Sequence, residues 1–308
     1  MNPRTLAVLG EALVDEFHDG PVPGGAPFNV ARSLAALGVP ALFISRIGAD
    51  DANGHMVRAS ARRYGLGEQG LQRDTRHATG RVSVHEQPGG AHRFEIHGDA
   101  AWDHLDAAPA LALLADARPA VLYFGSLAQR HADSRAAIRA LVKGFAGLRL
   151  LDLNLRPGTD TPLLAAESLM LADWVKVNDE ELARLADWFT DGAADEAAQV
   201  AALMARFALQ RLMLTCGAEG WRFYGPGGAL LARGPGEPQP RLVDTVGAGD
   251  AFTALLLAGL ALDRDLAATL ALANRYAAFI CGLRGPLPAD PQALTPWRNA
   301  LQALPPSP

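Results

Sequence analysis

The chain has 308 residues and a formal net charge of −5, with 49% hydrophobic and 20% charged residues. This balance is typical of a folded globular enzyme and excludes an intrinsically disordered chain. The small negative charge argues against a nucleic-acid-binding groove. No apolar run approaches the roughly 18 residues that a membrane-spanning helix needs.

The cysteines and the N-terminus indicate the compartment. Cys216 and Cys281 are far apart and have no metal-ligand spacing, which is typical of buried thiols in a reducing environment. The first ten residues lack the basic start and long apolar stretch of a signal peptide. We therefore expect a cytoplasmic protein.

Short apolar segments alternate with helical patterns over most of the chain. Apolar residues recur at helical spacing between these segments, for example in 133–145 and 195–207. Strands that alternate with helices predict an α/β fold with a mainly parallel central sheet between two helical layers. The predicted strands are Leu6–Gly10, Leu42–Ile47, Val121–Phe124, Leu148–Leu153, Trp174–Val177 and Leu212–Thr215. After residue 250 the pattern is helical, over Ala251–Leu262, Leu266–Cys281 and Pro291–Leu304.

Two segments depart from this alternation. Leu13–His18 follows the first strand without a helix, and Arg81–His97 reads as a β-hairpin that turns at Pro88–Gly90. We expect one domain over residues 1–308 with a small β lid built from about 12–20 and 80–98, above the strand ends where such sheets bind ligands. An irregular surface loop is the alternative.

Segment 244–252 is the most informative. It reads Asp-Thr-Val-Gly-Ala-Gly-Asp-Ala-Phe and leads into an apolar run. Gly247 and Gly249 permit a sharp turn and close approach of the backbone to a ligand. Asp250 then lies in the first turn of a helix, whose free N–H groups favour an anion. A carboxylate beside an anion site suggests that a group near a phosphate loses a proton. A glycine turn before a helix is the simpler interpretation.

A second glycine-rich segment, 24–31, reads Gly-Gly-Ala-Pro-Phe-Asn-Val-Ala and begins another predicted helix. Gly24 and Gly25 expose backbone amides. The side chain of Asn29 offers a donor and an acceptor, which suits sugar hydroxyls. Taken alone, the segment also fits a glycine turn and a capped helix.

Together these segments resemble the ribokinase-like, or PfkB, carbohydrate kinases. That family carries Gly-Gly-x-x-x-Asn-x-Ala near its N-terminus, then Leu-Ala-x-Leu-Gly as in 34–38, and a C-terminal signature like 244–252. The resemblance covers nearly the whole chain. It implies that Asp250 is the catalytic base. It also implies that backbone amides of the glycine turn hold the transferred phosphate, and the residues of this turn are Gly247, Ala248 and Gly249.

Two strand ends are similar to those of bacterial fructokinases. In segment 10–15, Gly-Glu-Ala-Leu-Val-Asp, the resemblance implies that Asp15 binds sugar hydroxyls. Segment 151–157 resembles the Asp-x-Asn-Leu-Arg segment, in which Arg156 would hold a phosphate or sugar oxygen. The implied sugar-binding set is Asp15, Gly24, Gly25, Asn29, Arg156 and Asp250.

Segments 175–181 and 214–220 resemble the family motifs Asn-x-x-Glu and Thr-x-Gly-x-x-Gly. The first implies Mg²⁺ held through water by Glu181, in keeping with the waters that Mg²⁺ retains. Capping of a helix is the alternative role of this motif. The implied ATP-binding set is Lys176, Asn178, Thr215, Gly217, Gly220, Gly247, Gly249 and Asn274.

The resemblance further implies a possible K⁺ site beside the anion site. Its ligands would be one carboxylate and several backbone carbonyls, from Asp244, Val246, Ile280, Leu283 and Gly285. The stretch 281–286 also fits a helix C-cap. Pro286 departs from the family, which commonly has alanine there.

The implied activity is ATP-dependent phosphorylation of a primary sugar hydroxyl, most simply fructose to fructose 6-phosphate. Phe28, where fructokinases usually have a small residue, and Leu153, where they usually have proline, leave the substrate open. The alternatives are 2-keto-3-deoxygluconate, ribose, a nucleoside, or binding without catalysis. The chain lacks a P-loop motif and a Gly-x-Gly-x-x-Gly after the first strand, which argues against those nucleotide folds. Pairing of two lids would cover their exposed faces and predicts a homodimer.

Overall fold

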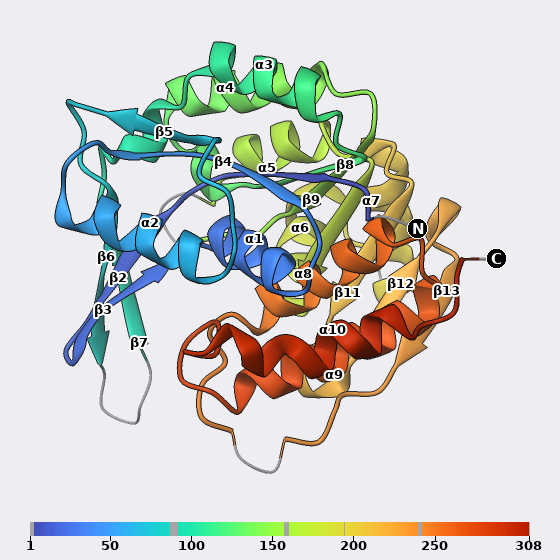
Figure 1. Cartoon of the computed structure of the whole chain (residues 1–308). Helices are drawn as coiled ribbons and strands as arrows, with labels where there is room; N and C mark the ends of the chain where they lie inside the picture. The colour runs from blue at the N-terminus through green and yellow to red at the C-terminus, as the bar shows by residue number, and fades with distance from the viewer. Residues whose placement is uncertain (1–2, 87–91, 157–159, 194, 240–241, 308) are drawn as a thin grey trace.

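The computed structural model describes residues 3–86, 92–156, 160–193, 195–239 and 242–307. A nine-stranded sheet crosses the molecule in the order β13-β12-β11-β10-β9-β8-β1-β4-β5 (Figure 1). Its strands are β1 (Leu6–Leu9), β4 (Ala41–Gly48), β5 (Leu71–Asp74), β8 (Val121–Gly125), β9 (Leu148–Asp152), β10 (Trp174–Asn178), β11 (Arg211–Thr215), β12 (Trp221–Tyr224) and β13 (Leu230–Gly234). Neighbours from β5 to β11 pair in parallel. The predicted mainly parallel α/β fold is confirmed, and the six predicted strands agree with the structure to within one residue at each end.

The sheet is buried on both faces because its strands are apolar on both. In β1, Leu6 and Val8 contribute to one hydrophobic cluster, whereas Ala7 and Leu9 contribute to the other. The first cluster includes residues of α1 (Ala26–Ala36), α2 (Ala52–Arg63), α8 (Ala248–Ala261), α9 (Leu266–Cys281) and α10 (Thr295–Gln302). The second includes residues of α3 (Ala107–Ala117), α4 (Ala132–Lys143), α5 (Pro162–Leu169), α6 (Asp179–Phe189) and α7 (Glu196–Phe207). This double burial produces the expected three layers.

A second, four-stranded sheet stands beside the main body, at the lower left of Figure 1. Its order is β3-β2-β6-β7, with β2 (Leu13–Phe17), β3 (Gly20–Gly24), β6 (Gly80–Glu86) and β7 (His92–Ile96). The predicted strand after β1 and the predicted hairpin are both present, while the hairpin tip at 88–90 lies outside the described residues. One face holds a small cluster of Leu13, Val82 and Val84, and on the same face Phe94, the partner of Val84 across the β6–β7 pair, is exposed. We call these four strands the small sheet.

The sequence patterns did not predict every element. The antiparallel strands β12 and β13 extend the sheet edge after β11, and β3 completes the small sheet. The predicted helix over Pro291–Leu304 is in fact a short 3-10 turn, Pro291–Leu294, followed by α10. Pro296 lies in the first turn of α10, and its missing N–H explains why the helix does not continue from the preceding turn.

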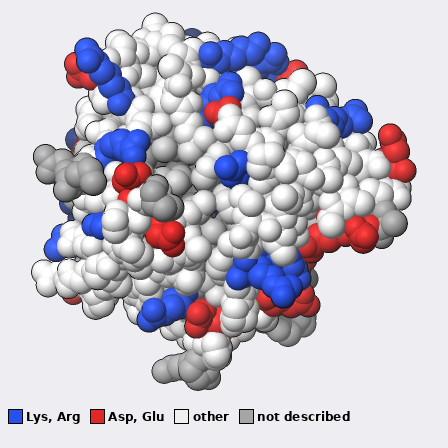
Figure 2. All heavy atoms as spheres, turned by 90° about the vertical axis from the view of Figure 1, so that its right-hand side faces the viewer, with Lys and Arg blue, Asp and Glu red and all other residues white. Residues whose placement is uncertain are grey.

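The surface carries no single dominant charge on the face that Figure 2 shows. Acidic and basic side chains lie in small groups there, separated by uncharged surface. Among the described residues, no helix combines the length and the apolarity that crossing a bilayer requires.

Candidate active site

The first part of the site is the start of α1, where the backbone of two glycines packs closely against neighbouring segments. Gly25 caps the helix with φ of 105°, and a Cβ atom there would lie 2.6 Å from the carbonyl oxygen of Glu11. A Cβ atom on Gly24 would lie 2.1 Å from Oδ2 of Asp15. Only glycine lets these segments approach so closely. The paired glycines thereby bring Glu11 and Asp15 beside the first turn of α1, which carries Asn29.

The start of α8 is the second part of the site. Gly247 precedes the helix with φ of 82°, and a Cβ atom there would lie 2.5 Å from Cα of Pro286. The N–H of Ala248 donates to the carbonyl oxygen of Thr245 at 3.2 Å. In the described part of the chain, no protein acceptor bonds the N–H of Gly249 or of Asp250. Two of the amides next to the predicted anion site are therefore available to a ligand.

The fold brings the two glycine-rich segments together. Nδ2 of Asn29 donates to Oδ2 of Asp250 at 2.7 Å. Burial raises the pKa of Asp250 to about 6, although the hydrogen bond from Asn29 opposes that shift. A carboxylate with this pKa is ionised at neutral pH and can still accept a proton, as a general base requires.

Two further acids surround Asp250. Burial raises the pKa of Asp15 to about 7, against the opposing charges of Arg32 and Arg156. Burial likewise raises the pKa of Glu11 to about 7, and its Oε2 has no hydrogen-bond partner among the described residues. Glu11 was not among the residues predicted from the sequence. Its position directly after the first strand of a parallel sheet was the signal that could have identified it.

Two more buried polar side chains reach the site without having been predicted. The hydroxyl of Tyr123, in β8, is buried without a partner in the described part of the chain. Burial raises its pKa, and the nearby carboxylates of Asp152 and Asp250 add to the shift. Arg32 is also buried, one helical turn after Asn29. Neither lies in a motif, so sequence patterns alone gave no signal for them.

A buried ion pair between β9 and β10 packs against the start of α8. Nζ of Lys176 donates to both carboxylate oxygens of Asp152 at 3.0 Å. The hydroxyl of Thr253 contacts the same carboxylate at 2.9 Å and the carbonyl oxygen of Gly249 at 3.0 Å. Burial alone would lower the pKa of Lys176. The carboxylates of Asp152 and Glu181 more than offset this effect, so the pKa is raised overall and the ammonium stays charged. Lys176 thus has a protein partner in addition to its predicted place in the nucleotide site.

The predicted magnesium motif forms a capping box. The side chain of Asn178 accepts from the N–H of Glu181 at 2.8 Å, and Glu181 accepts from the N–H of Asn178 at 2.9 Å. The other oxygen of Glu181 accepts from the N–H of Leu155 at 2.8 Å. Burial raises the pKa of Glu181. The capping role is therefore present, and a carboxylate oxygen can still accept a hydrogen bond from a metal-bound water.

Part of the predicted nucleotide-binding set lies at or just after the carboxyl ends of β10 and β11. Thr215 ends β11, and its hydroxyl contacts the carbonyl oxygen of Val177 at 3.4 Å. Gly217 and Gly220 follow with φ of 50° and 98°. Asn274, on α9, donates to the carbonyl oxygen of Pro235 at 2.8 Å. This bond ties α9 to the segment that follows β13.

The predicted K⁺ segments also lie together. Asp244 accepts from the N–H of Val246 at 3.0 Å and from the N–H of Gly285 at 3.3 Å. The N–H of Asp244 donates to the carbonyl oxygen of Cys281 at 3.2 Å. The predicted carbonyl ligands therefore come from the segment before α8 and from the end of α9 with the turn after it, and hydrogen bonds join these two parts of the chain. Pro286, which departs from the family pattern, packs against Gly247.

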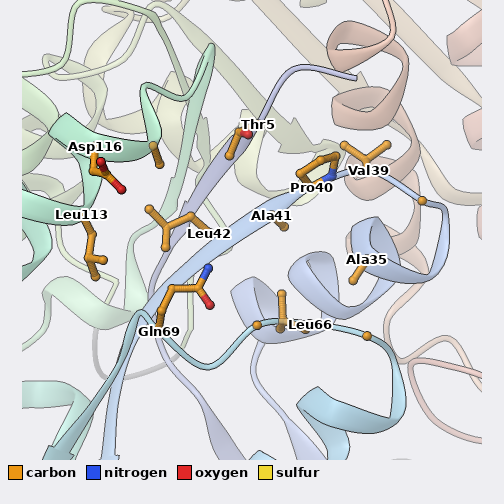
Figure 3. A pocket seen from close by; sticks show the side chains of 14 residues that line it. Thr5, Ala35, Val39, Pro40, Ala41, Leu42, Leu66, Gln69, Leu113 and Asp116 are labelled. Carbon is orange, nitrogen blue, oxygen red and sulfur yellow. The ribbon is translucent and has the colours of Figure 1, made fainter. Parts of the chain in front are cut away.

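A hollow of about 470 Å³ lies elsewhere on the molecule (Figure 3). Thr5 and Pro40, which line it, precede β1 and β4, so it opens at the opposite edge of the sheet from the site. Its lining includes Leu42, Leu66 and Leu113. We place the chemistry at the carboxyl ends of the strands because the acids, the free amides and the buried Lys176 converge there.

Comparisons with known proteins show the family to which the chain belongs. Residues 4–293 match the family model for pfkB family carbohydrate kinases. A fructokinase of Klebsiella pneumoniae is 33% identical over 310 residues, which cover 92% of this chain and 95% of that protein. The chain belongs to the pfkB family of carbohydrate kinases, and it is an ATP-dependent sugar kinase.

Solved structures show the same fold. A fructokinase from Xylella fastidiosa with bound ATP superposes with a TM-score of 0.80 at 24% identity, covering 97% of this chain and 98% of that one. A double mutant of the Vibrio cholerae O395 fructokinase, in its fructose-, ADP- and potassium-bound form, gives a TM-score of 0.78 at 25% identity and covers 96% and 98%. The shared fold extends over nearly the full length of each chain.

Proposed function

We propose that this kinase converts fructose and ATP to fructose 6-phosphate and ADP. The observation that carries the proposal is the Asn29–Asp250 contact of 2.7 Å, which joins the predicted sugar-binding segment of α1 to the half-buried carboxylate beside the free N–H groups at the start of α8. The named fructokinase relatives and the fructose-bound structural neighbour support fructose as the acceptor. Bulky Phe28 remains the reason to test other acceptors.

In the proposed reaction, Asp15, Asn29 and Arg156 hold the sugar hydroxyls together with the amides of Gly24 and Gly25. The carboxylate of Asp250 accepts the proton of the primary hydroxyl. That oxygen attacks the γ-phosphorus, and the bond from phosphorus to the β–γ bridging oxygen breaks, so ADP leaves. The amides of Gly249 and Asp250 stabilise the charge on the transferred phosphoryl group.

Lys176, Asn178, Thr215, Gly217, Gly220 and Asn274 form the proposed ATP surface. Mg²⁺, held through water by Glu181, would supply charge neutralisation on the phosphates. A K⁺ ion beside Asp244 is the further proposal. Chelation of Mg²⁺ should abolish turnover. Replacement of K⁺ by tetramethylammonium at fixed ionic strength should lower it, and an unchanged rate would contradict the K⁺ site.

The small sheet is the proposed lid. Asp15 lies on its strand β2, so a sheet that closes on the sugar would bring this carboxylate with it and exclude water. The exposed side chains of Val22 and Phe94 lie on the same sheet, which supports a dimer formed through it. Phe94→Glu should give monomers in sedimentation if the dimer uses this face. A cytoplasmic location completes the proposal.

The deciding experiment supplies the purified protein with ATP and a panel of fructose, 2-keto-3-deoxygluconate, ribose and nucleosides. Phosphorus NMR identifies which hydroxyl carries the product phosphate. Exclusive phosphorylation of another acceptor would overturn fructose as the substrate. Tight sugar binding without any product would instead support a non-catalytic binding protein.

A further inference from the structure

Arg32 is an unusual residue for the interior of this site. It lies on α1, and only 3% of its surface is exposed. Within the described residues, no carboxylate lies within 4.0 Å of its guanidinium. Its contacts are instead neutral oxygens and two rings. A buried guanidinium without a close carboxylate is costly, so its retention calls for a specific role.

The contacts of Arg32 are directional. Nη2 donates to Oδ1 of Asn29 at 2.5 Å and to the carbonyl oxygen of Pro23 at 2.9 Å. Nη1 donates to the hydroxyl of Ser60 at 2.8 Å. The guanidinium lies 4.2 Å from the ring centroid of Phe28. Planar donors and a stacked ring fix the orientation of this side chain.

This orientation determines how the amide of Asn29 lies. A guanidinium has only donors, so the group that faces it must be the amide oxygen. The amide nitrogen then faces the opposite way, towards Oδ2 of Asp250 at 2.7 Å. Without the guanidinium, the amide could turn and present its oxygen to the carboxylate, which would repel it. The positive charge also polarises the amide and strengthens its N–H as a donor.

We propose that Arg32 is a positioning residue for phosphoryl transfer: it orients the amide of Asn29 so that this amide donates to Asp250 and keeps that carboxylate ionised. The proposal rests on the proposed role of Asp250 as the base. Phe28 and Tyr64 hold the guanidinium in place, the latter with its ring centroid 5.5 Å away. Phe28, which the family resemblance marked as a departure, thereby acquires a role as the platform for Arg32.

The test measures the carboxyl pKa of Asp250 in the ligand-free enzyme by carbon NMR. The Asp250→Asn variant identifies the resonance by its loss. Arg32→Met removes the donors and keeps an unbranched chain, and the pKa should rise by about one unit, the size expected for a weakened hydrogen bond to a charged group. Ser60→Ala is the matched control, because it removes another partner of the same guanidinium and leaves Asn29 in place. An unchanged pKa in Arg32→Met would overturn the proposal.

A double-mutant cycle separates the contact from a simple charge effect. In an Asn29→Leu background, Arg32→Met should shift the pKa of Asp250 much less, because the connecting amide is absent. An equal shift in both backgrounds would show that Arg32 acts through space, and would overturn the proposed contact. No other group around Asp250 is substituted in the cycle, and a change that Arg32→Met causes in them, as in Asp15, is present in both backgrounds. These groups are Glu11, Asp15, Tyr123, Asp152, Arg156 and Lys176.

Kinetics distinguish this proposal from that of the base. The acidic limb of kcat should move upwards with the NMR pKa in Arg32→Met, and turnover should recover at higher pH. A purely structural defect would lower kcat equally at every pH. If the NMR pKa moves and the limb does not, the contact with Asn29 stands and the role of Asp250 as base fails.

If Arg32→Met does not fold, the orientation of the Asn29 amide can still be measured in the wild-type protein. With nitrogen-labelled asparagine, the side-chain NH₂ of Asn29 is identified by its loss in Asn29→Leu. Its shift should follow the titration of Asp250 and become independent of pH in Asp250→Asn. A shift that does not follow this titration would overturn the proposed orientation.

Discussion

The ammonium of Lys176 lies 3.0 Å from both carboxylate oxygens of Asp152, in the interior below the start of α8. The pair joins β10 to β9, and Thr253 links it to the carbonyl oxygen of Gly249. The position of the glycine turn therefore depends on a charged pair that is itself almost entirely buried.

Loss of one partner should be more harmful than loss of both. Lys176→Met should lower the free energy of unfolding by about 3–5 kcal/mol, because it leaves the carboxylate of Asp152 buried and unpaired. Lys176→Met combined with Asp152→Leu should recover much of that loss. Urea unfolding measures both. If Lys176 served only the nucleotide, the single variant would keep its stability and lose affinity for ADP.

Removal of the proposed base should leave binding intact. Asp250→Asn keeps the shape of the side chain and removes its basicity, so turnover should fall by about a hundred- to ten-thousandfold. Calorimetry should show nearly unchanged affinities for sugar and ADP. Asp195→Asn, which replaces the acid that caps α7 and keeps a good cap, is the control. Loss of turnover by less than about tenfold would remove Asp250 from this role.

The pH profile should carry the signature of the same residue. A base with a pKa of about 6 is ionised above that value and protonated below it. The kcat should therefore be constant above neutral pH and decline as the pH falls through about 6. Stopped assays in overlapping buffers give the profile. A limb near the ordinary value of a surface aspartate, about 4, would show that burial does not act on the base.

Gly247 and Gly249, which flank Ala248, should respond differently to the same substitution. A Cβ atom on Gly249 would lie 3.4 Å from Nζ of Lys176, an ordinary contact, so Gly249→Ala should fold and lose activity by crowding the phosphate. Gly247→Ala combines a φ of 82° with a 2.5 Å clash against Pro286, so it should lower stability by about 2–4 kcal/mol. Melting curves and turnover of the two variants separate these effects. Equal stability of both would contradict the described turn.

The sequence predicted the parallel strands well because both faces of each are apolar. In β1, for example, every residue is buried, and the run is visible without any tertiary information. Strand β13 was missed because it buries little: Leu230 and Leu231 are exposed, and the glycines around them read as loop. Strand β12 is mostly buried, but it has only four residues and lies between Gly220 and Gly225, so its segment also read as loop. Short edge strands gain their stability from pairing, which a local pattern does not contain.

Some residues of the site could likewise be predicted from the sequence, and others could not. Glycine turns have a local steric cause, so Gly25 and Gly247 could be recognised from the sequence and the resemblance. The role of Arg32 could not, because a single arginine on a helix normally reads as a solvent-exposed residue. Only the packing of α1 against α8, which are distant in sequence, turns its side chain towards Asn29 and Asp250.

The acids of the site also act as a store of protons. Glu11 and Asp15 have pKa values of about 7, and Asp250 about 6, so the ligand-free enzyme retains part of its protons near neutrality. Sugar hydroxyls that donate to these carboxylates favour the ionised forms, and binding must then release protons to the solvent. The calorimetric heat of fructose binding should therefore depend on the ionisation enthalpy of the buffer. The same heat in every buffer would mean that the acids are already ionised before the sugar arrives.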